Sequence, residues 1–299
     1  MIISVSRRTD IPAFYTEWFF NRLQEGFVLV RNPMNYRQVS RILLNPSLVD
    51  CFVFWTKNPE NLTDKLDRLG QYHYYFLITL NPYGPAIERN LSSINSRIKA
   101  FQKLSAKIGK NKTIWRYDPI IFTDEIDLKY HAENFGLLAS CLEGYTDRCQ
   151  ISFVDFYKKA KRNLKYMNAE KADHEKKYVT GKTLSEIASK HKIKMEARSE
   201  SISLASIGID RGRCIDDRLI SEITGQNLKI PKDKNQRHLC GCAASIDIGT
   251  YNTCRHGCSY CYANFSDKAV SDNIKKHNVK SPLLIGNIEL EDKIKDRKM

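Results

Sequence analysis

The chain has 299 residues and a formal net charge of +14 at pH 7, and 42% of its residues are hydrophobic. This length fits one large domain or two small ones, and the hydrophobic content excludes wholesale disorder. No apolar run approaches the ~18 residues that a membrane helix needs. The start, MIISVSRRTD, lacks the basic flank and apolar stretch of a signal peptide. We expect a soluble cytoplasmic protein without membrane contact.

Up to about residue 200, short apolar runs alternate with longer amphipathic stretches. The apolar runs predict strands at Ile2–Ser6, Phe27–Val30, Cys51–Trp55, Tyr74–Leu80, Thr113–Tyr117, Gln150–Val154 and Lys194–Ala197. The stretches between them predict helices at Tyr15–Gln24, Asn35–Leu44, Glu60–Leu69, Glu88–Ile108, Leu128–Leu142, Lys158–Asn168 and Thr183–His191. This alternation predicts a parallel sheet. An eighth strand within Ser245–Tyr251 would close a (β/α) barrel of the TIM type.

The expected organisation is a barrel body in residues 1–205 and a cysteine-rich segment in residues 206–299 that packs on it. The second part is polar and irregular up to about Cys242, and Lys- and Asp-rich after Ala263. The two parts form either separate domains or one continuous domain.

Polar residues recur at the carboxyl ends of the predicted strands, which is the face where parallel α/β barrels build their active sites. They are Arg7, Arg8, Thr9, Asp10, Arg31, Asn32, Thr56, Lys57, Thr79, Asn81, Arg116, Asp118, Asp155, Arg198 and Glu200. Any single one also fits a helix cap or a surface ion pair. Their recurrence over seven strands predicts an enzyme, with Lys57, Arg116 and Asp118 as candidate catalytic residues.

The nine cysteines are the most informative feature of the composition. An odd number in a chain without a signal peptide argues against a disulfide framework. Cys254, Cys258 and Cys261 have the spacing C-x3-C-x2-C. Three thiolates on one tight loop, with Gly257 allowing a close turn, suit a [4Fe–4S] cluster, which ordinarily takes four cysteines. One iron would then remain open.

This spacing, with the aromatic Tyr260 before the last cysteine, resembles the cluster motif of the radical S-adenosylmethionine (SAM) superfamily. The resemblance implies a (β/α) barrel, a [4Fe–4S] cluster that binds SAM, formation of a 5′-deoxyadenosyl radical, and an electron donor such as flavodoxin or ferredoxin. It also implies that Tyr260 and Gly257 shape the adenine side. In that superfamily the cysteine loop follows the first strand, whereas here it lies near the C-terminus. The order of elements therefore looks circularly permuted.

More of the chain resembles the DUF1848 family of bacterial proteins, whose function is unknown and whose C-terminal cysteines are likened to the radical SAM cluster. The matching stretches are SRRTDIPAFY, FWTKNP, WRYDPI, KDKNQR and CGCAASIDIGTYNTCRHGCSYCYA. They extend from Ser6 to Ala263. This resemblance implies the same fold and cluster but no particular substrate.

The remaining cysteines leave alternatives open. Cys214, Cys240 and Cys242 suit an auxiliary iron–sulfur cluster, free thiols or a zinc site. A zinc ion on Cys258/Cys261 and Cys240/Cys242 is the rival to the cluster, and the loop residue His256 is expected not to be a ligand. Cys51, Cys141 and Cys149 are expected to be buried small hydrophobic residues.

Two other classes of function compete with the radical SAM enzyme. Residues 158–198 carry thirteen Lys/Arg against five Asp/Glu, a local net charge of +8, which suits an anionic substrate or a nucleic acid but equally a set of solvated helix faces. The first rival is a nucleic-acid-binding protein with a structural zinc or iron–sulfur site. The second is a barrel hydrolase that would use Asp10 and Asp118. The substrate is not predicted.

Overall fold

The computed structural model describes residues 1–297. Its strands are β1 (Ile2–Val5), β2 (Phe27–Asn32), β3 (Asn35–Leu43), β4 (Cys51–Thr56), β5 (Tyr74–Thr79), β6 (Thr113–Ile120), β7 (Arg148–Phe153), β8 (Lys194–Ala197), β9 (Ile209–Arg211), β10 (Ile246–Asp247) and β11 (Lys293–Asp296). Its helices are α1 (Ile11–Phe14), α2 (Thr16–Glu25), α3 (Glu60–Thr63), α4 (Ile94–Ile108), α5 (Leu128–Leu142), α6 (Lys158–Leu164), α7 (His174–Lys190), α8 (Asp217–Thr224) and α9 (Asp267–Ile274).

Eight parallel strands form the main sheet, in the order β10-β1-β4-β5-β6-β7-β8-β9. The parallel α/β architecture is as predicted, but the closed barrel is not, because the sheet is open between β10 and β9 in the described residues. These edge strands have only two and three residues, so they offer few backbone groups for closure. The predicted second strand, β2, is also absent from this sheet. β10, the last strand of the sheet in sequence, lies beside β1, the first.

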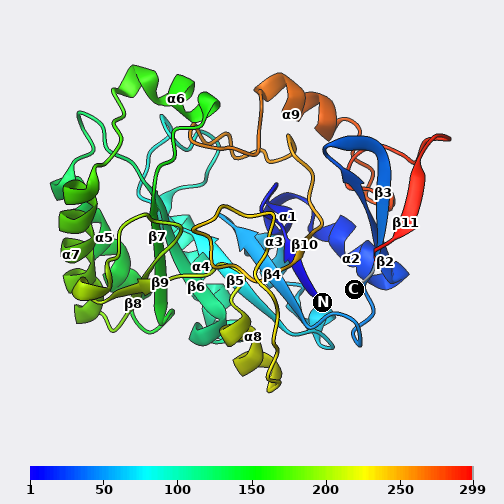
Figure 1. Cartoon of the computed structure of the whole chain (residues 1–299), viewed down its shortest axis with the longest axis horizontal. Coiled ribbons are helices and arrows are strands. Elements are labelled where there is room, and N and C mark those ends of the chain that lie inside the picture. The colour runs from blue at the N-terminus through cyan, green and yellow to red at the C-terminus, as the bar shows by residue number, and fades with distance from the viewer. Residues whose placement is uncertain (298–299) are drawn as a thin grey trace.

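A smaller sheet of order β11-β3-β2 stands at the right of the view in Figure 1. The predicted helix at Asn35–Leu44 is wrong: this segment is β3, which pairs antiparallel with β2 and parallel with β11. Val39 and Ile42 have the three-residue spacing of a helix face, but they belong to separate apolar clusters. In a strand, residues three positions apart point to opposite faces. A strand that is covered on both faces therefore gives the same apolar spacing.

Strand β4 illustrates why the central strands are near-continuous apolar runs. All six of its residues are buried. Phe52 and Phe54 belong to the main apolar core, whereas Cys51, Val53 and Trp55 belong to a second core that α8 helps to form. Because successive side chains of a strand point to opposite faces, both faces must be covered.

Helices differ from the predictions mainly at their first residues. α4 begins at Ile94 rather than Glu88, because Ser93 accepts a hydrogen bond from the backbone N–H of Ser96 at 3.2 Å. α7 begins at His174 rather than Thr183, after Asp173 caps Lys176 N at 2.8 Å. The segments predicted as helices at Glu60–Leu69 and Lys158–Asn168 each form a short α-helix followed by a 3-10 turn.

Among the described residues, no helix combines the length and the apolar character that crossing a bilayer requires.

Candidate functional site

The carboxyl ends of the parallel strands surround a cavity of about 430 Å³. The loops after β1, β4, β8 and β10 and the ends of β5, β6 and β7 all contribute to its lining. Six of the nine cysteines line it. We call Cys254, Cys258 and Cys261 the first thiol set, and Cys214, Cys240 and Cys242 the second thiol set. The topology therefore brings together two cysteine groups that the sequence separates.

The first thiol set lies on the loop after β10, which the segment before α4 holds in place. The backbone N–H of Ser259 donates to Ile87 O at 2.8 Å, and Glu88 forms an antiparallel bridge with Cys258. Gly257 has φ +67°, and a Cβ there would lie 3.0 Å from Asn90 Nδ2. The turn between the first two thiols therefore requires glycine, both for its backbone angle and for the close approach.

Asp10 ties the same loop to the ends of β1 and β4. Its carboxylate accepts hydrogen bonds from Ala13 N at 3.0 Å and Lys57 N at 2.8 Å, and His256 Nε2 lies 2.7 Å from Oδ2. His256, predicted as an exposed loop residue, is buried. Its contact with Asp10 gives it a positioning role in the loop.

Asp247, at the end of β10, fixes the start of the cysteine segment against β1. It accepts hydrogen bonds from Ser4 Oγ at 3.0 Å, Ser6 Oγ at 2.6 Å and the backbone N–H of Arg7 at 2.7 Å. The side chain of Arg7 lies 3.6 Å from the same carboxylate. The two outermost strands on this side of the sheet are thus joined by a buried carboxylate.

Glu88 organises the wall behind Cys258. Its buried carboxylate binds Lys57 Nζ at 2.6 Å and Arg97 Nη1 at 3.2 Å, and it accepts a hydrogen bond from Tyr260 OH. Burial alone would raise the pKa of Glu88, but Lys57 and the other partners lower it below its usual value. The sequence reasoning missed Glu88 because it placed this residue inside a helix.

Asp118 occupies the centre of the cavity wall. Its carboxylate accepts hydrogen bonds from Arg116, Arg198 and Ser152. Burial alone would raise the pKa of Asp118, but the guanidinium groups of Arg198 and Arg116 lower it to about 2. Asp118 is therefore a fixed negative charge that holds two arginines in place.

The second thiol set comes from the loop after β9 and the segment before β10. All three residues belong to one apolar group of side chains and line the cavity. Arg198 Nη1 donates to Cys214 Sγ at 2.9 Å. Burial would raise the pKa of Cys214, but its contacts with Cys242 and Arg198 lower it to about 6.

Several cavity-lining side chains carry buried polar atoms without a partner. In residues 1–297, eight such atoms occur, and six belong to residues that line this cavity: Arg7 Nη1, Thr9 Oγ1, Trp55 Nε1, Arg116 Nε, Arg198 Nε and His256 Nδ1. Four of them are nitrogen donors that cannot accept a hydrogen bond. Because buried polar groups are normally paired, the cavity suits a ligand rich in hydrogen-bond acceptors.

No three His, Cys, Asp or Glu side chains in residues 1–297 are arranged to hold a single metal ion. A [4Fe–4S] cluster makes a different demand, because each cysteine bonds to a separate iron. The thiol chemistry of both sets fits such clusters, and their shared cavity provides the space.

The structure collects most of the predicted site residues. Lys57, Arg116, Asp118, Tyr260 and all six cysteines line the cavity, as do Arg7, Arg8, Thr9, Asp10, Thr56, Thr79, Asp155 and Arg198. Gly257 lies behind it, where it lines a neighbouring surface hollow. Asn81 is fully buried next to it and donates to Asp118 O at 2.9 Å.

Three predicted placements are wrong. Arg31 and Asn32 end β2 in the small sheet, where Arg31 binds Asp292 instead of facing the cavity. Cys141 is exposed on α5, whereas Cys51 and Cys149 are buried as predicted. Glu200 lies in an adjoining hollow, where it binds Lys177 Nζ at 2.6 Å.

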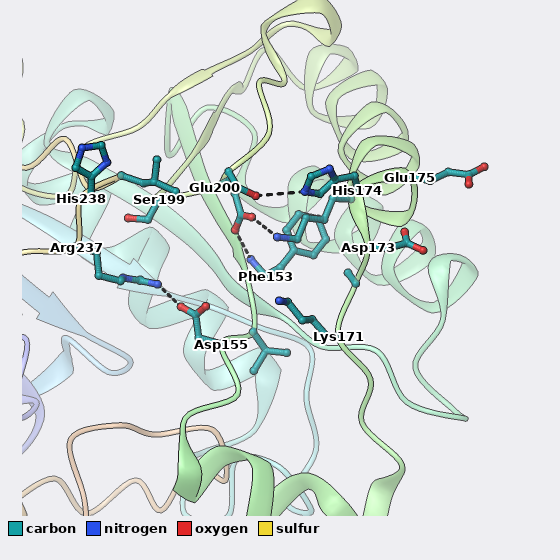
Figure 2. A pocket seen from close by; sticks show the side chains of 15 residues that line it. Phe153, Asp155, Lys171, Asp173, His174, Glu175, Ser199, Glu200, Arg237 and His238 are labelled. Atoms are coloured by element: carbon teal, nitrogen blue, oxygen red, sulfur yellow. Dashed lines mark hydrogen bonds and ion pairs between the residues drawn. The ribbon is translucent and has the colours of Figure 1, made fainter.

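That adjoining hollow has a volume of about 890 Å³ and shares Phe153, Asp155 and Ser199 with the cavity. Figure 2 shows Arg237 and Asp155 paired on one side of it, facing Lys171 and Glu200. Both members of this ion pair line both spaces. The pair therefore stands where the two spaces meet.

Residues 2–263 match a family described as "Domain of unknown function (DUF1848)". No curated protein matches the chain. The matched stretch contains every residue of the two thiol sets.

Proposed function

The chain belongs to the DUF1848 family, and we propose that it is a radical SAM enzyme that binds a [4Fe–4S] cluster on Cys254, Cys258 and Cys261. When bound, the reduced cluster would supply one electron that splits SAM into methionine and a 5′-deoxyadenosyl radical, which abstracts hydrogen from the substrate. The electron would come from a donor such as flavodoxin or ferredoxin.

One observation carries this proposal: the first thiol set faces a cavity at the carboxyl ends of parallel strands, together with six cationic side chains. These are Arg7, Arg8, Lys57, Arg116, Arg198 and Arg237. A volume of about 430 Å³ lies within the range of small-molecule sites, roughly 300–1,000 Å³.

The position of β10 also supports the proposal. This strand leads into the cysteine loop and lies at the sheet edge next to β1, so it is the first strand in space although it comes late in sequence. The order of strands then agrees with a permuted radical SAM fold. In this open sheet, unlike a closed barrel, the cavity is bounded on one side by the segment that carries the second thiol set.

The chain's own residues would bind and orient the reactants. Arg116, Arg198 and Lys57 carry the positive charge that a carboxylate or phosphate group needs, and Asp118 fixes both arginines. Tyr260, held by Glu88, and the turn at Gly257 would shape the space beside the cluster. The adjoining hollow, which meets the cavity at Arg237 and Asp155, would give the substrate a route to it.

The hydrolase alternative has less support, because its two carboxylates are already occupied. Asp10 accepts from Ala13 and Lys57 and contacts His256, and Asp118, with a pKa of about 2, is a weak base. The rival function is a nucleic-acid-binding protein with a structural metal site. The experiment must distinguish it from the radical SAM enzyme.

The first prediction concerns SAM cleavage. Anaerobic protein incubated with dithionite and SAM should release 5′-deoxyadenosine, measured by chromatography, even without the true substrate. The rate should be slow, because a substrate normally helps to close and order such a site. The variant with Cys254, Cys258 and Cys261 all changed to Ala should release none.

Cys51→Ala is the matched control, because Cys51 is a buried thiol away from the cavity, and it should behave as the wild type. A wild-type protein that holds its full iron and still forms no product above the triple variant would contradict the proposal. The nucleic-acid-binding alternative would then lead.

A further inference from the structure

The second thiol set is a group of three buried cysteines that the proposed SAM chemistry does not use. Cys240 and Cys242 flank Gly241, and Cys214 comes from a loop 26 residues earlier in the chain. All three are buried. The simplest interpretation is that they are ordinary small apolar residues of the second core, to which all three belong.

The backbone brings these thiols together by specific contacts. Ala243 N donates to Ile215 O at 3.0 Å, which sets the two cysteine segments side by side. Gly241 approaches Arg213 so closely that a Cβ would lie 3.3 Å from its Cγ. Cys240 N donates to Arg237 O at 2.9 Å. As a result, all three thiols lie in one apolar group of side chains at the wall of the cavity.

The surroundings differ from those of inert core cysteines. The second thiol set lines the cavity, so its three thiols are not enclosed by apolar side chains alone. Arg198, half-buried and paired with Asp118, donates to Cys214 Sγ at 2.9 Å, and Cys214 Sγ donates to Gln150 Oε1 at 3.5 Å. The Nε of Arg198 still lacks a partner. A cation and a free donor beside thiols suit a negatively charged cluster, whose sulfurs accept hydrogen bonds.

We propose that Cys214, Cys240 and Cys242 hold a second [4Fe–4S] cluster in the same cavity that the first thiol set lines. Three cysteines would leave one iron without a thiolate. A structural zinc ion would need a fourth ligand to close its tetrahedron, whereas an open position facing a cavity suits a cluster that meets a substrate. The proposal rests on the proposed function and deepens it, because the second cluster would line the same cavity as the first.

The test measures metal content and does not depend on activity. Each variant is reconstituted without air using iron and sulfide, and iron, acid-labile sulfide and zinc are counted beside Mössbauer or EPR spectra. The wild type should hold about eight iron atoms, and a variant with the first thiol set changed to Ala should keep about four as a [4Fe–4S] spectrum. The variant with the second thiol set changed to Ala should also keep about four, and a sixfold variant should keep none.

One control guards against loss of the fold, and one further variant tests the contact of Arg198 with the second thiol set. Cys51→Ala removes a buried thiol from the same apolar core and should keep the wild-type iron content. Arg198→Lys keeps the cation and should alter the EPR signal of the second cluster while the first-set signal stays unchanged.

A first-set variant that is folded by circular dichroism but holds no iron, or that binds one zinc instead, would overturn the second cluster. Retention of about four iron atoms in that variant, with no SAM cleavage by the wild type, would instead overturn only the proposed function. The two proposals thus fail by different measurements.

Discussion

At the scale of single residues, the site depends on carboxylates that each join several elements. Asp10, Asp247 and Glu88 are buried, and each binds groups from at least two segments. Such carboxylates are costly to desolvate and hold their charge only while their partners remain in place. Removing one should therefore affect stability as well as the site.

Glu88→Ala should lower the free energy of unfolding by about 3–5 kcal/mol, because it leaves the half-buried cation of Lys57 and the buried cation of Arg97 without their carboxylate. Urea denaturation at pH 7 measures the loss. The matched control is Glu17→Ala, which breaks an exposed pair with Lys65 and should cost less than about 1 kcal/mol. Equal losses in the two variants would argue against the role assigned to Glu88.

At the scale of elements, the contact between β1 and β10 decides where the cysteine loop starts. The two strands pair over only two residue pairs, Ile3 with Ile246 and Ser4 with Asp247. The hydrogen bonds from β1 and its following loop to Asp247 must therefore do much to hold β10 against β1. Gly249, two residues further, passes so close to Ser6 that a Cβ would lie 2.0 Å from Ser6 Oγ and 2.6 Å from Ser6 Cβ.

Gly249→Ala should force β10 away from β1, since these separations are far below van der Waals contact. The expected result is a clear fall in melting temperature and loss of iron from the first thiol set, measured by thermal denaturation and iron analysis. Gly84→Ala is the control, because a Cβ at residue 84 meets no atom within 4 Å. A Gly249→Ala protein as stable and iron-rich as this control would contradict the packing described.

At the scale of the whole molecule, the sequence predicted what local patterns determine. β4 was placed almost to the residue because its apolar run is continuous, and the first thiol set was evident from spacing. Sheet closure was not predictable, since it depends on the pairing of β9 and β10 at opposite edges. The approach of the Cys214 and Cys242 segments likewise depends on a backbone hydrogen bond between residues far apart in sequence, from Ala243 N to Ile215 O.

The last prediction concerns how global stability depends on pH through His131, a residue of α5 buried in the main fold. Tyr117 OH lies 2.8 Å from Nδ1, and Nε2 lies 2.9 Å from Ile121 O. A neutral ring with its proton on Nε2 satisfies both contacts. Burial lowers the pKa of His131 from 6.5 to about 4.

Since the folded pKa lies below the unfolded one, the unfolded chain binds more protons between these values. The contribution of His131 to stability is therefore complete above pH 6.5 and is lost as the pH falls toward 4. At about 1.4 kcal/mol per pKa unit, the loss is about 3 kcal/mol. Urea denaturation at pH 7.5 and at pH 4.5 gives the free energy of unfolding at each pH. The difference between the two values should be smaller for His131→Gln than for the wild type, by most of this amount. Exposed His73→Gln should keep the wild-type difference, and a His131→Gln protein that does the same would show that His131 is not the group responsible.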